Sequence, residues 1–196
     1  MPDVTTLDAP DAEAAAVADD MLYEVIDGRV VEKPPMGAFQ NWIAVWLQHS
    51  LNSSPQVRGI GFAYPEMLFL LDPARKLKRR PDVAFVSFER WPADRPASME
   101  EAWDVIPDLA IEIVSKSNTA SEMVLKVRDY FGSGVRQVWI VYPVEQMVYV
   151  YRSVAEVSIL QLGQDLDGGD VLPGFRISVA NLLKIKAADD PSPAVG

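Results

Sequence analysis

Cysteine is absent from this sequence of 196 residues, and histidine occurs once, as His49. The absence of cysteine excludes a disulfide framework, thiolate metal sites and a cysteine nucleophile within the chain. The single histidine excludes histidine-rich metal sites and any mechanism that needs two histidines from one chain. Catalysis or metal binding must therefore use other side chains.

Basic residues are also missing from the first 20 positions, and no apolar stretch reaches about 18 residues. We therefore expect neither a secretory signal nor a membrane span, and we expect a cytoplasmic protein. Hydrophobic residues make up 49% of the chain and charged residues 23%, which is the composition of a folded globular protein. The length suits one domain with a sizeable core.

The formal net charge of −10 argues at first against a nucleic-acid partner. However, residues 1–20 and 187–196 carry eight acidic residues and no lysine or arginine, so the net charge of residues 21–186 is only −2. We interpret both ends as solvated tails and residues 21–186 as a single domain. Five basic residues fall within six positions: Arg75, Lys76, Lys78, Arg79 and Arg80. Such a cluster is typical either of a solvated loop or strand edge, or of a surface that contacts a phosphate backbone.

The hydrophobic pattern predicts a fold of mixed α/β type. An Asp-Gly turn within residues 23–31 predicts an N-terminal β-hairpin, and apolar residues at helical spacing predict helices over 38–52 and 119–131. The second helix begins with a Thr-Ala-Ser-Glu capping box. Further strands are expected over residues 60–71 (interrupted at Pro65), 83–86, 109–114, 137–142, 147–152 and 156–162, and a terminal helix over 179–185. This order predicts an α+β domain in which a mixed β-sheet is flanked by few helices.

Two acidic residues occupy unusual positions. Glu112 lies within the otherwise apolar run from Leu109 to Val114, and Asp82 directly precedes the short strand at residues 83–86. A buried carboxylate costs several kcal/mol unless it is paired, hydrogen-bonded or bound to a metal. One interpretation is that both carboxylates meet on neighbouring strands and hold Mg²⁺. The alternative is that Glu112 faces solvent at the end of its strand.

Lys126 follows Glu112 in the chain and lies beside the apolar stripe of the predicted helix. It could reach back to the strand ends and stabilise a transition-state anion. Alternatively, Lys126 could form a surface pair with Glu122, one helical turn earlier, worth only a few tenths of a kcal/mol. The spacing alone favours neither interpretation.

A series of short motifs runs through the chain in a specific order. The motifs are Tyr23-Glu24 with Asp27-Gly28, Arg80-Pro81-Asp82-Val83, Pro107-Asp108-Leu109 with Glu112-Ile113-Val114-Ser115, Ser117-Asn118-Thr119, Lys126 with Tyr130, Gly134-Val135, and Val138-Trp139-Ile140-Val141. Over residues 20–185 the chain resembles the Uma-two family, a group of bacterial restriction-endonuclease-like proteins in the PD-(D/E)XK nuclease superfamily.

The resemblance implies a restriction-endonuclease-like fold and a DNA endonuclease that depends on Mg²⁺ or Mn²⁺. Asp82 and Glu112 match the two metal-binding acids, and the backbone carbonyl of Ile113 is the implied further ligand. The superfamily's usual lysine, two positions after the second acid, is Val114 here. Lys126 matches the helix lysine that this family carries in its place.

Glu24 matches an acid in the family's first hairpin, which implies a further catalytic residue. The basic cluster at residues 75–80, directly before Asp82, would then contact DNA at the mouth of the site. We expect DNA as a partner, no organic cofactor and no membrane contact. We also expect a homodimer, because two symmetric sites are the simplest way to cut both strands.

The chain also departs from the family pattern. A histidine common near the start of the first long helix is replaced by Gln40 and Asn41, and an aspartate common after the tryptophan-containing strand is replaced by Tyr142. The alternative hypothesis is therefore an inactive or weakly active nuclease fold that serves as a nucleic-acid-binding or regulatory module. A metal-dependent hydrolase of small phosphorylated substrates is a further alternative.

Overall fold

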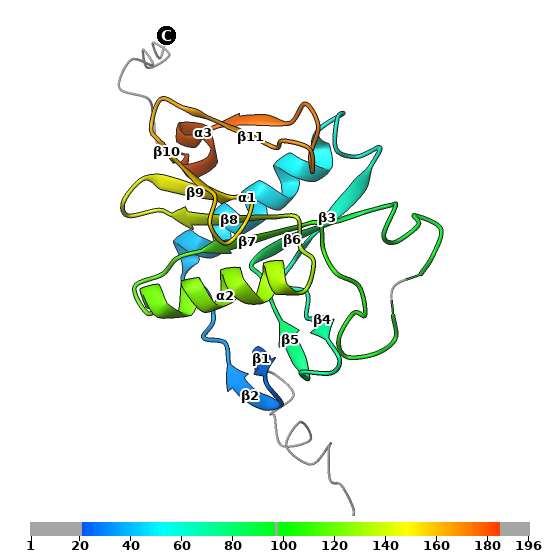
Figure 1. The fold of residues 1–196 in the computed structure, drawn as a ribbon. Coiled ribbons are helices and arrows are strands. Elements are labelled where there is room, and N and C mark those ends of the chain that lie inside the picture. The colour runs from blue at the N-terminus through cyan, green and yellow to red at the C-terminus, as the bar shows by residue number, and fades with distance from the viewer. Residues whose placement is uncertain (1–20, 97, 185–196) are drawn as a thin grey trace, which may run out of the picture.

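The computed structural model describes residues 21–96 and 98–184 and contains a mixed sheet with helices on both faces (Figure 1). The tails expected at residues 1–20 and 187–196 lie outside the described residues. In the part of the chain that is described, no helix is long and apolar enough to span a membrane. The mixed sheet, its flanking helices and the N-terminal hairpin confirm the predicted fold class.

The main sheet has six strands in the order β10-β9-β8-β7-β6-β3. These strands are β3 (Gly61–Pro65), β6 (Val83–Ser87), β7 (Leu109–Ile113), β8 (Gln137–Tyr142), β9 (Met147–Tyr151) and β10 (Val157–Gln161). The β7–β8 pair is parallel, whereas its neighbours in this sheet pair antiparallel. Parallel strands need a crossover, and helix α2 (Ala120–Gly132) supplies it between β7 and β8.

A second sheet of four antiparallel strands carries the predicted hairpin. Its order is β2-β1-β5-β4, formed by β1 (Tyr23–Ile26), β2 (Arg29–Glu32), β4 (Phe69–Asp72) and β5 (Leu77–Arg79). The hairpin turn has φ of 49° at Asp27 and 80° at Gly28, the positive angles that an Asp-Gly turn supplies. Strand β5 contains the middle of the basic cluster and was not predicted.

The single strand expected over residues 60–71 is wrong. The chain forms β3 and β4, which belong to different sheets. Pro65 ends β3, and Glu66 follows with a φ of 44°, which turns the chain away from the main sheet. The proline signal therefore marks a change of sheet rather than an irregularity within one strand.

The helices divide between the two faces of the main sheet. Helix α1 (Ala38–Ser53) and helix α3 (Val179–Leu183) pack on one face around Leu47, Trp139 and Leu182. The unpredicted hairpin of β11 (Asp165–Asp167) and β12 (Arg176–Ser178) also contributes to that face. Helix α2 packs on the other face, in front of the sheet in Figure 1. Because both faces are covered, β6, β7 and β8 are almost wholly buried.

The predicted start of α2 is confirmed in atomic detail. The Thr119 side chain accepts a hydrogen bond from the Glu122 backbone N–H, and the Glu122 carboxylate accepts one from the Thr119 N–H. This capping box satisfies two backbone N–H groups and fixes the first turn of α2.

Candidate active site

A pocket of about 180 Å³ lies where the β1–β2 hairpin, the start of β6, the end of β7 and helix α2 meet. Its charged lining residues are Glu24, Glu32, Lys33, Arg79, Asp82, Glu112, Glu122 and Lys126. Strands β6 and β7 pair antiparallel with Val83 opposite Ile111, and continuing this register places Asp82 across from Glu112. Directly opposed residues project from the same face of a sheet, so both carboxylates enter the pocket together.

Asp82 is buried, and both of its carboxylate oxygens have partners. Oδ2 accepts a hydrogen bond of 2.6 Å from the backbone N–H of Ile113, and Oδ1 accepts one of 2.7 Å from Lys33 Nζ. Lys33 also donates to the Arg80 carbonyl at 3.0 Å and is itself mostly buried. The backbone N–H of Ile113 and the ammonium of Lys33 therefore hold the Asp82 carboxylate in one orientation.

Glu112 is 3% exposed and points into the pocket, so the interpretation that it faces solvent is wrong. Its Oε2 accepts a hydrogen bond of 2.8 Å from Lys126 Nζ, and its Oε1 accepts one of 2.5 Å from the Tyr130 hydroxyl. Burial raises the pKa of Glu112 above its ordinary value, and Lys126 offsets this effect only in part, while the nearby Asp82 charge adds to it.

Lys126 is buried and lies between two carboxylates. Its Nζ is 2.8 Å from Glu112 Oε2 and 3.6 Å from Glu24 Oε1. Burial opposes the charge on Lys126, but Glu112 and Glu24 outweigh that effect and raise its pKa, so the ammonium stays charged. Glu122 instead caps the helix, so the surface-pair interpretation of Lys126 is wrong.

Glu24 connects this site to a second ion pair behind it. Its Oε2 accepts a hydrogen bond of 2.7 Å from Arg79 Nη1, and its Oε1 accepts one of 3.0 Å from the Arg80 backbone N–H. Burial alone would raise the pKa of Glu24, but Lys126 and Arg79 bring it below its ordinary value. Arg79 continues the network by donating at 2.5 Å to Asp129 of α2.

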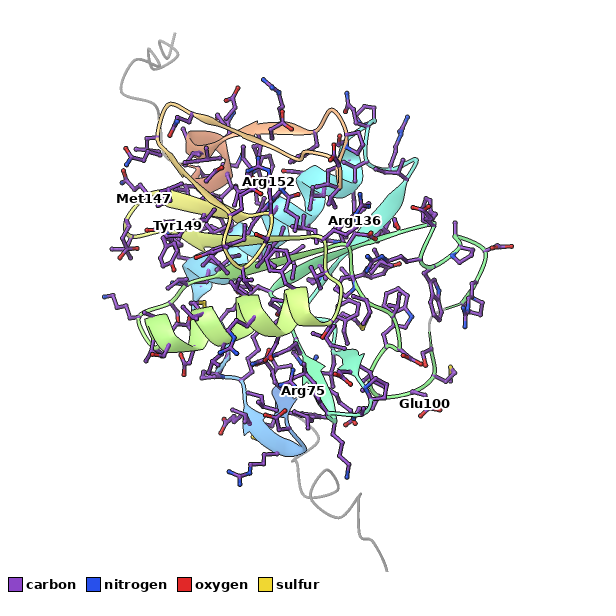
Figure 2. The ribbon with its side chains drawn as sticks, viewed as in Figure 1. Arg75, Glu100, Arg136, Met147, Tyr149 and Arg152 are labelled. Carbon is purple, nitrogen blue, oxygen red and sulfur yellow. The ribbon has the colours of Figure 1, made fainter. Side chains whose placement is uncertain are left out.

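The basic cluster at residues 75–80 does not form a uniform surface. Residues alternate along β5, so Leu77 and Arg79 point inward and Lys78 points outward. Arg79 is 3% exposed and ion-paired, which makes the expectation that it contacts DNA wrong. Arg75, beside β5 in Figure 2, forms ion pairs with Asp27 and Asp129.

Sequence reasoning gave no site role to three members of this network and a different role to a fourth. Lys33, Asp129 and Tyr130 had no role, although Tyr130 belongs to the motif series, and Arg79 was expected to contact DNA. Lys33 directly follows the hairpin and precedes two prolines, and nothing in that pattern marks it as buried. Within the described residues, no group of three or more acidic or histidine side chains is placed to share one metal ion. The two opposed carboxylates are thus the candidate metal ligands, and Glu24 contacts cations instead.

Comparison with known proteins identifies the family of this chain. The model of the Uma2 family, described as "Putative restriction endonuclease", matches residues 10–180. No curated protein matches the chain. A similar solved structure is that of "a putative nuclease belonging to DUF820" from Anabaena variabilis ATCC 29413, at 20% identity and a TM-score of 0.72 over 83% of this chain and 89% of that chain. This neighbour shares the fold. Since the family match covers most of the chain, the protein belongs to the Uma2 family of restriction-endonuclease-like proteins.

Proposed function

We propose that this protein is a DNA endonuclease that hydrolyses phosphodiester bonds with Mg²⁺ or Mn²⁺. The observation that supports it most is the pair of opposed, buried carboxylates of Asp82 and Glu112 in a pocket that also holds two lysines. Family membership supports the same class of reaction.

The residues of the pocket fit a hard divalent cation. Mg²⁺ typically takes one or two protein carboxylates and completes its shell with water and substrate phosphate. Asp82 and Glu112 supply those carboxylates, and the backbone carbonyl of Ile113 is proposed as a further ligand. The bound ion would supply Lewis acidity and neutralise negative charge on the phosphate.

The remaining residues position and balance the reacting groups. Lys126 keeps its charge between Glu112 and Glu24, so it can stabilise the negative charge that develops on the phosphorus oxygens. Lys33 contacts Asp82 from the opposite side and can move to a phosphate oxygen when Asp82 binds a cation. Glu24 acts as a positioning residue, since it holds Lys126 on one side and Arg79 on the other.

DNA contact is proposed for the exposed members of the basic cluster. Arg75 and Lys76 are exposed, and Lys78 forms only a surface pair with Glu101, at 3.3 Å. Lys76 and Lys78 can neutralise backbone phosphates without breaking the buried network, whereas Arg75 must first release Asp129. The Arg80 guanidinium donates to the carbonyls of Glu66 and Tyr23 and serves mainly to join the two sheets.

The test is incubation of supercoiled plasmid, linear duplex and single-stranded DNA with Mg²⁺, with Mn²⁺ and with EDTA. We expect cleavage that requires the metal and that falls by more than about a hundredfold in Asp82→Asn, because metal catalysis supplies several kcal/mol. Glu101→Gln is the matched control, since Glu101 is an acid in a surface ion pair outside the pocket. Absence of metal-dependent cleavage by the wild type, or equal loss in both variants, would contradict the proposal.

One observation favours a second candidate function, a nuclease fold without catalysis. All four oxygens of Asp82 and Glu112 have protein partners, and Lys33 and Lys126 already balance their charges. Such a site could be stable without a metal and serve only nucleic-acid binding. Titration with Mn²⁺ separates the two functions. A catalytic site binds Mn²⁺ through Asp82, so Asp82→Asn should abolish that binding. The alternative predicts that the protein binds DNA and that Asp82→Asn leaves its Mn²⁺ affinity unchanged.

A further inference from the structure

A second cavity of about 250 Å³ lies apart from the carboxylate pocket, beside the β3 edge of the main sheet. Its walls come from β3, the end of β6 and the loop between β6 and β7, which projects beyond the sheet in Figure 1. Four of its lining residues are aromatic rings in mutual contact: Phe62, Tyr64, Trp91 and Trp103. Neither the family assignment nor the proposed catalytic site uses this cavity.

The rings of the cavity are held in fixed orientations. Tyr64 and Trp91 both contact Trp103 edge-to-face, with ring centroids 4.9 and 5.0 Å away. Phe62 packs against Tyr64 at 5.2 Å and is 42% exposed, so it stands at the rim. A rigid aromatic wall of this kind offers flat surfaces on which another planar ring can stack.

One residue that lines the cavity carries a buried hydrogen-bond donor without an acceptor. Trp103 is 3% exposed, and among the described residues its indole N–H has no hydrogen-bond partner. The indole N–H of Trp91, by contrast, donates to the Arg95 carbonyl at 3.0 Å. A buried donor without a partner costs free energy, so a ligand acceptor that reaches this N–H after a small shift of the lining side chains gains a hydrogen bond that the protein alone leaves unmade.

Arg95 contributes a positive charge to the lining of the cavity. The Arg95 guanidinium lies 3.8 Å from the centroid of the Trp91 ring, and Arg95 is exposed. Within the described residues it forms no ion pair with a carboxylate, so it is available to an anion outside the cavity. Planar stacking surface, a buried donor and an exposed cation together match a nucleobase with its attached phosphate.

The size of the cavity favours one ring system over a peptide segment. At about 250 Å³ it lies below the range of about 300–1,000 Å³ that is usual for drug-sized ligands. Proline-rich peptides also bind aromatic grooves, but they extend over several residues along an open surface.

Both sites lie on the same face of the main sheet. Ala84 and Val86 of β6 pack on the α2 face, and residues alternate along a strand, so Asp82 shares that face with Val86. Four residues of strand separate the two, which is about 13 Å at about 3.3 Å per residue. In stacked B-form DNA that separation corresponds to about four base steps.

We propose that this cavity binds one unpaired nucleobase of the DNA strand whose scissile phosphodiester enters the pocket of Asp82 and Glu112. In this arrangement the base stacks on the exposed Phe62 ring, with Trp91 and Trp103 forming the walls of the cavity, accepts a hydrogen bond from the Trp103 indole, and its phosphate contacts Arg95. The choice of DNA rests on the proposed function. The base pocket makes single-stranded or locally unpaired DNA the preferred substrate.

The test follows the indole N–H signals of the protein by NMR during titration with single-stranded octamers of dA and of dT, in EDTA so that no cleavage occurs. Trp103→Phe identifies the Trp103 signal. We expect both octamers to shift it, whereas an abasic octamer and a fully paired duplex leave it in place. Phe62→Ala should raise the dissociation constant of the octamers at least about fivefold, since stacking on one aromatic side chain contributes that much or more.

Phe39→Ala is the matched control, because Phe39 is a similarly exposed phenylalanine on α1 that does not line the cavity. An unshifted Trp103 signal, an equal shift by the abasic octamer, or equal effects of Phe62→Ala and Phe39→Ala would overturn the proposal. A shift by a proline-rich peptide but not by the octamers would also overturn it. These readouts need no cleavage. A failure of the base-pocket proposal is therefore distinguishable from a failure of the nuclease proposal, which the plasmid cleavage assay tests.

Discussion

At the scale of single residues, the site is a buried network in which charges nearly cancel. Glu24, Asp82, Glu112 and Asp129 face Lys33, Arg79, Lys126 and Arg75 through direct ion pairs. Removing one partner from such a pair leaves an uncompensated charge inside the protein, which costs about 3–5 kcal/mol. The same charges that stabilise the fold therefore limit which substitutions can be used to study catalysis.

Lys33 should compete with a metal ion for Asp82. Its Nζ is 2.7 Å from Asp82 Oδ1. Two unit positive charges about 4 Å apart repel by about 4 kcal/mol at an effective dielectric constant of about 20, and a divalent ion doubles this repulsion. We therefore expect Lys33→Met to tighten Mn²⁺ binding by about tenfold or more while it slows cleavage. Isothermal titration calorimetry with Mn²⁺ measures the first effect. Lys78→Met, which removes a half-buried lysine outside the pocket, is the control. An unchanged Mn²⁺ affinity in Lys33→Met would show that Lys33 does not compete with the ion for Asp82.

Glu24 should make stability depend on pH in a defined direction. Its pKa is lowered in the folded protein, so its contribution is fully present above its ordinary value and is lost as the pH falls through the lowered value. At pH 7 we expect Glu24→Gln to reduce the free energy of unfolding by about 3 kcal/mol. The difference from wild type should shrink in acid, where both side chains are neutral.

Urea unfolding between pH 7 and pH 3 measures this difference. Glu101→Gln, which removes a carboxylate that pairs with Lys78 at the surface, should cost less than about 1 kcal/mol at any pH. A constant difference for Glu24→Gln across the whole range would contradict the assigned ion pairs with Arg79 and Lys126.

The sequence alone could indicate some of these residues but not others. Glu112 stands out because a charged residue inside an apolar run must have a buried partner, and the structure supplies Lys126 and Tyr130. Lys33 carries no such signal, because it follows an exposed strand and meets Asp82 across 49 positions of the chain. Only the register of the two sheets brings that pair together.

At the scale of elements, local signals predicted the helices and the hairpin well. The Thr119 capping box and the Asp27-Gly28 turn are determined by neighbouring residues, so their geometry follows from the sequence itself. Strands β5, β11 and β12 have three residues each and exist only because a partner strand lies beside them. Their sequences contain too few apolar positions to reveal a period, which explains why they were missed.

The close pairing of β3 with β6 predicts an intolerance at Gly61. A Cβ atom there would overlap the carbonyl oxygen of Val86 and the ring of Phe85, whereas a Cβ at Gly59 would meet nothing within 4 Å. We expect Gly61→Ala to reduce the free energy of unfolding by about 1–3 kcal/mol, as overpacking does, and Gly59→Ala to change it by less than about 0.5 kcal/mol. Urea unfolding of the two variants compares them, and equal stabilities would contradict the close approach of the two strands.

At the scale of the whole molecule, the net charge of −10 is unevenly distributed. Residues 1–20 contain six acidic residues and no basic residue, and residues 21–186 have a net charge near −2. The total charge argues against a nucleic-acid partner, but most of the negative charge lies outside residues 21–186. The distribution of charge is therefore compatible with such a partner. The homodimer stays a prediction that sedimentation can decide.

The acidic N-terminal segment should weaken DNA binding through charge. We expect deletion of residues 1–20 to tighten DNA binding several-fold at low salt, and we expect this gain to vanish near 1 M salt, where the Debye length is about 3 Å. Fluorescence anisotropy with a labelled oligonucleotide in EDTA measures both affinities. The control for charge is the whole chain with the six acidic residues of positions 1–20 changed to their amides. If this variant binds DNA with the affinity of the wild type while the deletion variant binds DNA more tightly, charge is not the cause.

The most direct test of the nuclease account is the rate of plasmid cleavage by wild type and by Glu112→Gln at saturating Mg²⁺ or Mn²⁺. Glutamine keeps the size of the side chain and an acceptor for Lys126, while it removes the carboxylate that we propose holds the metal. The account predicts metal-dependent cleavage by the wild type and a rate more than about a hundredfold lower in a variant that unfolds cooperatively. Equal rates for the two proteins, or no cleavage by the wild type with either metal, would contradict it.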